Sequence, residues 1–101
     1  FDDDKVSFTV ETPNGYIINI DEDAQEIGIA DEHGNLVLMD AEGITVESSA
    51  DLNLRATGDV NIEGTNMTSK ASSKFSADGG SGAELTSGGQ AVIKGSLVAI
   101  N

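Results

Sequence analysis

The single histidine of the chain is the first residue whose type could carry chemistry. His33 lies in the run Asp-Glu-His-Gly-Asn at residues 31–35, and imidazole is a common metal ligand and acid–base group. Asp, Gly and Asn in such a run are typical of a turn, where a histidine is solvated. If the chain formed a symmetric trimer, the three copies of this outward turn would lie at the periphery. Their histidines could not gather around the trimer axis. We therefore interpret His33 as a turn residue and predict no catalytic role for it.

Two acidic runs could bind a hard cation through carboxylate oxygens. They are Asp-Glu-Asp at residues 21–23 and Asp-Glu at residues 31–32, and neither has the ligand spacing of a calcium-binding loop. The run Asp-Gly-Gly-Ser-Gly at residues 78–82 resembles the turns of calcium-binding β-rolls, but their nine-residue pattern does not recur. The sequence therefore predicts solvated acidic turns and no metal site.

A serine between glycines could also belong to a nucleophile elbow. The run Gly-Gly-Ser-Gly-Ala at residues 79–83 is one residue short of that motif, lacks its strand–turn–helix context and has no plausible base nearby. The sequence also has no phosphate-binding loop. We therefore predict that the chain is not an enzyme and that it needs no cofactor.

The composition indicates one acidic domain with many tight turns. The 101 residues include 18 acidic and five basic side chains, which gives a formal charge of −13. Such a surface repels nucleic acid and anionic lipid headgroups, so we expect no nucleic-acid partner. Aromatic residues make up only 4% of the chain, and 12 residues are glycine. The absence of cysteine excludes disulfides and thiolate chemistry.

An internal repeat with a period near eight residues organises residues 43–101. The first three units, at residues 44–46, 52–54 and 60–62, are apolar–polar–apolar triplets, which is the alternation of a short β-strand, and small or turn residues separate the units. The inward positions of successive units are Ile44/Val46, Leu52/Leu54, Val60/Ile62, Met67/Ser69, Phe75/Ala77, Ala83/Leu85, Ala91/Ile93 and Val98/Ile100. We predict a regular β-helix over residues 44–101 that ends in a blunt tip.

Residues 1–43 carry a looser version of the same pattern. Val6 to Val10 alternates as a strand, and Asn14-Gly15 is a hairpin turn signal. The pairs at residues 18/20, 27/29 and 36/38 then follow at nine-residue steps. We predict an N-terminal β-meander here, and residues 1–5 look like the cut edge of a longer chain or the tail of an upstream domain.

One chain offers only two inward residues per unit, which buries little and leaves strand edges exposed. Three chains wound around one axis would share a core and pair their strands. We therefore predict an all-β fold, an intertwined three-stranded trimeric β-helix prism. Its predicted core is Ile18, Ile20, Ile27, Ile29, Leu36, Leu38, Ile44, Val46, Leu52, Leu54, Val60, Ile62, Met67, Phe75, Leu85 and Ile93. The sequence leaves open whether Ser69 and the inward alanines line a lumen with water, an ion or a lipid.

Several runs, taken in order, resemble the C-terminal β-helix of VgrG-type spike proteins. They are Glu-Thr-Pro-Asn-Gly at 11–15, Ile-Asn-Ile-Asp-Glu-Asp at 18–23, Asp-Glu-His-Gly-Asn at 31–35, Gly-Ile-Thr-Val at 43–46, Gly-Asp-Val-Asn-Ile at 58–62 and the closing run 88–101. This family forms the central spike of contractile phage tails, type VI secretion systems and extracellular injection particles. The resemblance implies a homotrimeric structural needle that pierces a target membrane. It also implies missing upstream domains that join the needle to a baseplate and tail tube.

The resemblance further implies a partner at the C-terminal end. Family members often carry a PAAR-repeat cone on the blunt end, and some phage spikes instead have a His-x-His iron site at the tip. The chain departs from the second pattern, because His33 is far from the C-terminus. We therefore expect a PAAR-like cap on the exposed tip residues Leu97, Val98, Ala99, Ile100 and Asn101. The expected location is the cytoplasm of the producer during assembly, and then the tip of a secreted or injected particle.

Three other readings of the repeat remain open. A trimeric phage tail fibre or adhesin would bind a surface receptor or sugar through outer pockets, for which few aromatic residues are available. A left-handed β-helix acyltransferase would need a repeat period of six, whereas the period here is near eight, and it usually needs a catalytic histidine. A calcium-binding solenoid would lose stability with a chelator.

Overall fold

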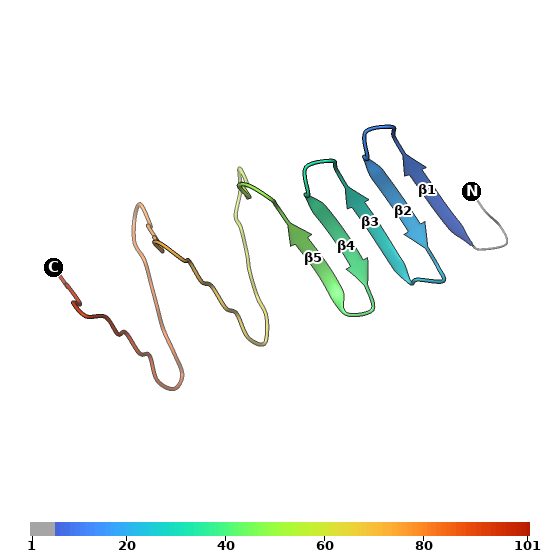
Figure 1. The fold of residues 1–101 in the computed structure, drawn as a ribbon. Helices are drawn as coiled ribbons and strands as arrows, with labels where there is room; N and C mark the ends of the chain where they lie inside the picture. Colours follow the sequence, from blue (N-terminus) through green and yellow to red (C-terminus); the bar gives the residue numbers. More distant parts are fainter. Residues whose placement is uncertain (1–5) are drawn as a thin grey trace. The chain divides into compact units, whose positions relative to one another are not determined.

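The computed structural model describes residues 6–101 and is all-β, with no helix among these residues. Five antiparallel strands form one open sheet in sequence order, as Figure 1 shows. The strands are β1 (Ser7–Glu11), β2 (Ile17–Asp21), β3 (Glu26–Ala30), β4 (Leu36–Asp40) and β5 (Gly43–Glu47). The predicted all-β class is confirmed. The expectation for residues 1–5 lies outside the described residues.

Aspartates at strand ends close three of the four turns. The Asp21 carboxylate accepts a hydrogen bond from the Ala24 amide at 3.0 Å, and Asp40 accepts one from the Glu42 amide at 2.9 Å. Asp31 accepts from the amides of two residues in the β3–β4 turn. Short side chains that bond to nearby backbone amides favour turns over continued strands. The acidic runs of the sequence therefore supply turn-closing acceptors.

The β3–β4 turn also holds the chain where it leaves the sheet. After β5, the backbone amide of Ser49 donates to Asn35 Oδ1 at 2.8 Å, and Ser49 Oγ donates to the His33 carbonyl at 2.6 Å. Gly34 has a φ of +90°, and an added Cβ would lie 3.4 Å from the Ser49 Cβ. A glycine therefore suits this position both by conformation and by space.

Residues 48–101 form no strand within the chain, although their backbone keeps the repeat. It bends at pairs of residues and runs straight between them, with pairs at 49/50, 57/58, 65/66, 72/73, 80/81, 88/89 and 96/97. These corners are seven or eight residues apart, which is the spacing of the apolar pairs. The predicted strands are absent here because a strand requires a hydrogen-bonded neighbour, and the described part of one chain supplies none.

A small residue precedes each corner. These residues are Ser48, Ala56, Gly64, Ala71, Gly79, Ser87 and Gly95. Two of the serines close their corners in the same way, because Oγ accepts from the amide two residues ahead and donates to the carbonyl three residues ahead. A Cβ on Gly79 would overlap the Gly82 carbonyl oxygen. Tight corners therefore explain the small residues between the predicted units.

The contacts divide the chain into two units. The first ends at Asn61 and contains the sheet, and the second runs from Ile62 to Asn101. No helix of the described residues is long and apolar enough to cross a membrane.

Candidate interaction surface

One face of the sheet carries only apolar side chains. The strand register aligns them in two rows that cross all five strands. The first row is Phe8, Ile20, Ile27, Met39 and Ile44, and the second row is Val10, Ile18, Ile29, Val37 and Val46. Cross-strand neighbours of this kind stabilise a sheet by packing against one another. We call these ten residues the apolar face.

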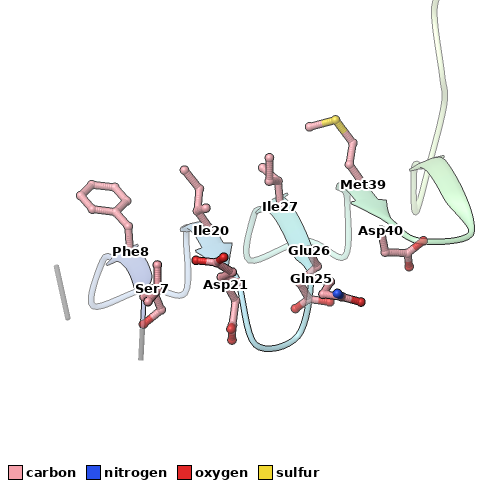
Figure 2. Close-up of a pocket in the computed structure, with 11 residues that line it drawn as sticks. Ser7, Phe8, Ile20, Asp21, Gln25, Glu26, Ile27, Met39 and Asp40 are labelled. Atoms are coloured by element: carbon pink, nitrogen blue, oxygen red, sulfur yellow. The ribbon is translucent and has the colours of Figure 1, made fainter. Parts of the chain in front are cut away.

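The charged residues of the strands lie on the other face. In Figure 2, Phe8, Ile20, Ile27 and Met39 point to one side of the sheet, whereas Asp21 and Asp40 point away from it. Because side chains alternate along a strand, the five acidic residues of the strands all belong to this polar face. They are Glu11, Asp21, Glu26, Asp40 and Glu47. The apolar face is therefore free of charge in a chain that is otherwise strongly acidic.

The apolar face is uncovered in a single chain. No side chain among residues 6–101 is buried, and all ten residues of the apolar face are exposed. Ile29 is 51% exposed and Ile44 is 71% exposed. Full burial of one such side chain contributes about 1.5–3 kcal/mol. A contiguous exposed apolar area of this kind marks an interaction site.

Two open hollows lie along the apolar face, one at each of its two rows. One has a volume of about 860 Å³ and is lined by Phe8, Ile20, Ile27 and Met39 together with turn residues. The other has a volume of about 560 Å³ and is lined by the second row and by Leu52, which follows the first corner. The second hollow therefore extends the apolar surface from the sheet into the first straight segment.

The structure differs from the sequence prediction in which side chains of β4 lie on the apolar face. Leu36 and Leu38 were expected to share a face with Ile27 and Ile29, but the partners of those isoleucines are Met39 and Val37. The turn decides this phase, because Ala30 pairs with Leu36 across the closed loop 31–35. A shift of one residue moves every side chain of a strand to the opposite face. Leu36 and Leu38 instead lie half-buried on the polar face, where Leu38 packs beside Gly28.

Sequence reasoning also missed four residues of the apolar face. Phe8, Val10, Val37 and Met39 were outside the predicted core, although the structure places them in the two rows. The alternation in β1 was a usable signal for Phe8 and Val10. The run Leu-Val-Leu-Met in β4 fits both phases, so only the turn length could have indicated Val37 and Met39.

The remaining predicted core residues lie in the straight segments after the first corner. Each segment contains one pair of the repeat's inward positions, and the large side chains are exposed. They are Leu52, Leu54, Val60, Ile62, Met67, Phe75, Leu85 and Ile93. The predicted tip residues are also exposed, with Leu97 at 85% and Ile100 at 87%. Their role in a trimer core or a tip contact stays a prediction.

Glu32 and His33, two of the residues considered for metal binding or catalysis, contact Tyr16 of the β1–β2 turn. Tyr16 Oη donates to Glu32 Oε1 at 3.3 Å, His33 Nε2 lies 3.6 Å from the same oxygen, and the Tyr16 and His33 rings meet edge to face with centroids 6.4 Å apart. The His33 side chain is 61% exposed. No group of three or more possible metal ligands occurs among residues 6–101. The cluster joins the β1–β2 and β3–β4 turns.

Asp31 is the ionisable group whose environment is most specific. The Asn35 side-chain amide donates to Asp31 Oδ2 at 2.7 Å, and the backbone amides of Asn35 and His33 donate to Oδ1 at 3.0 and 2.9 Å. These hydrogen bonds, the Asn35 side chain foremost, hold the pKa of Asp31 below its ordinary value against the opposing effect of desolvation. The ionised carboxylate therefore organises the turn that receives Ser49.

Comparison with protein-family models finds no family that matches the chain, and comparison with curated proteins finds no match.

Proposed function

We propose that the chain is a segment of a homotrimeric β-helix that serves as a rigid, membrane-piercing spike of a contractile injection machine. One observation carries the proposal. Residues 48–101 make no backbone-to-backbone hydrogen bond within the described chain, although they run straight between regular corners. Extended backbone with unpaired amides and carbonyls is a template for strand pairing with another chain.

The spacing of the corners favours copies of the same chain as partners. A strand that pairs along its whole length needs a neighbour of equal length that turns at the same place. Corners at steps of seven or eight residues recur through the whole segment, and another copy has the same steps in the same order. A closed ring of three copies would leave no lateral edge, which is the arrangement that symmetric assemblies favour.

The sheet would contact the other copies in a different way. Strands β1 to β5 already pair within the chain, so a second copy reaches this part through the apolar face. Three apolar faces turned toward one axis would bury both rows and leave the five strand acids outside. We therefore propose side-by-side sheets before the first corner and strand pairing between copies after it.

A mechanical role follows from this assembly and from the resemblance to VgrG-type spikes. Each backbone group of such a rod would be tied to a neighbouring strand, which makes it stiff. Three copies at −13 each carry −39, which keeps the shaft soluble and repelled by anionic surfaces. On this proposal, domains such as those that precede the β-helix in VgrG-type spikes join the rod to a baseplate, and a PAAR-like protein caps Leu97, Val98 and Ile100.

The test is the absolute mass of the purified chain by light scattering during size exclusion. We expect about three times 10.4 kDa. A candidate PAAR-repeat protein added to this material should co-elute with it, and replacing Leu97 and Ile100 by aspartate should abolish that complex. A folded species with the mass of one chain would exclude the spike. A three-chain mass together with binding to a glycan array would favour a tail-fibre adhesin instead.

A further inference from the structure

We propose that the hydrogen bonds between Asn35 and Ser49 set the register in which three copies align. This inference rests on the proposed trimer and concerns how its copies find their alignment. Asn35 would then be a positioning residue. Its side chain holds Ser49, at the first corner of the repeat, against a sheet whose strands pair in one defined register within the chain.

The repeat alone does not determine the alignment of copies. The steps between its corners are 8, 8, 7, 8, 8 and 8 residues, and every corner is preceded by a small residue. Two copies displaced by one segment would therefore still meet corner to corner over most of their length. Weakly specified strands of this kind are prone to slip.

The sheet, in contrast, has only one register. Its four strand pairs form within the chain, and its turns are closed by specific hydrogen bonds. The two rows of the apolar face also have a defined order, with Phe8 at one end and Ile44 at the other. On this proposal, three identical sheets meet through these faces in the one alignment that places like residues of the rows side by side.

Ser49 connects the sheet to the repeat, so the alignment of the sheets can determine the alignment of the segments that follow. Its amide and hydroxyl bond to Asn35 Oδ1 and the His33 carbonyl at 2.8 and 2.6 Å. Asn35 is itself held by Asp31 at 2.7 Å. Among the described residues after β5, Ser49 alone makes hydrogen bonds to the sheet or its turns. The position of the first corner is therefore determined by the β3–β4 turn.

A register reporter can be built because the chain contains no cysteine. In the proposed trimer, Ser69 is an inward position, so Ser69→Cys would place three thiols near the axis when the copies are aligned. One pair can then form a disulfide, and a denaturing gel shows a two-chain band. A displacement by one segment places each thiol opposite a different residue and prevents the bond.

The experiment measures this two-chain yield in full-length chains with Ser69→Cys after refolding and oxidation. We expect Asn35→Ala to lower the yield several-fold while the native mass stays at three chains. Asn53→Ala should leave the yield unchanged, because it removes an exposed asparagine in the first straight segment. Ser49→Ala keeps the amide donor and loses the hydroxyl bond, so an intermediate yield is expected, and it carries the test if Asn35→Ala does not fold.

The outcomes separate this inference from the proposed function. An undiminished two-chain yield in both Asn35→Ala and Ser49→Ala, with three-chain mass, would show that the hydrogen bonds between Asn35 and Ser49 do not set the register. The proposed trimer would be unaffected by that result. A one-chain mass for the parent protein would instead overturn the proposed function, and the inference with it.

Discussion

At the scale of single residues, three aspartates act as acceptors for turn amides. Asp21, Asp31 and Asp40 each bond to backbone amides a few residues ahead. This use explains why carboxylates gather at the turns without forming a cation site among the described residues. It also gives the acidic turns a stability that depends on ionisation.

Acid should weaken the β3–β4 turn through Asp31. Its pKa is lowered in the folded chain by hydrogen bonds from Asn35 and His33, so the stabilisation is complete above the ordinary aspartate pKa of about 3.9 and is lost as pH falls through the lower folded value. Asp31→Asn should lower the melting temperature at pH 7. It should also reduce the further fall between pH 5 and pH 2, measured by circular dichroism beside the unchanged protein. An equal acid response in both proteins would contradict this assignment.

The corner glycines should differ sharply in their tolerance of alanine. A Cβ at Gly79 overlaps the Gly82 carbonyl oxygen, whereas a Cβ at Gly80 meets nothing within 4 Å. Gly79→Ala should therefore cost about 1–3 kcal/mol of stability per copy, because the corner must shift. Gly80→Ala should cost much less in the same chemical denaturation experiment. Equal losses would show that the corner relaxes freely.

At the scale of elements, the five strands pair with one another within the chain, and the sheet exposes one apolar face. Much of it followed from the sequence, because period-two alternation indicated β1, β2, β3 and β5. The phase of β4 could not be predicted, since four apolar residues in succession satisfy either face and hydrogen bonds in the turn decide between them. The corners after β5 were visible as small residues, but sequence spacing alone could not show which strands pair within the chain.

Self-pairing of the first two strands can be tested directly. Thr9 and Asn19 are cross-strand partners, and Thr9 Oγ1 donates to Asn19 Oδ1 at 2.7 Å. The double variant Thr9→Cys/Asn19→Cys should form a disulfide within each chain, because opposite positions of an antiparallel pair bring Cβ atoms close enough. A denaturing, non-reducing gel should show one-chain material. Covalent dimers or trimers would show that β1 and β2 pair between copies.

The apolar face should tolerate no charge at its centre. Ile29→Asp would place three carboxylates near the axis of the proposed trimer without partners, at a cost of about 3 kcal/mol or more per copy. Light scattering should then show a loss of the three-chain species. Thr45→Asp adds the same charge on the polar face and should change stability by less than about 0.5 kcal/mol. Retention of the trimer in Ile29→Asp would mean that the copies meet elsewhere.

At the scale of the whole molecule, charge and shared burial act in opposite directions. In the proposed trimer, copies that each carry −13 repel one another, whereas apolar side chains that are exposed in one chain gain burial by contact between copies. The balance should therefore depend on both salt and protein concentration.

The melting temperature should rise when salt increases from about 0.01 M to about 0.15 M, because the screening length falls from about 30 Å to about 8 Å. It should also rise with protein concentration, since association and folding are linked. Differential scanning calorimetry over a tenfold concentration range would measure the second effect. A melting temperature independent of concentration would point to a fold that one chain completes alone.

The lack of any buried side chain among residues 6–101 of one chain also affects biosynthesis. If the chain forms the proposed trimer, a copy released alone from the ribosome has no core to close, and its productive step is an encounter with two others. The rate of that step rises steeply with local chain density. Neighbouring ribosomes on one messenger provide such a density, and we expect the protein to assemble most efficiently from chains made on the same polysome.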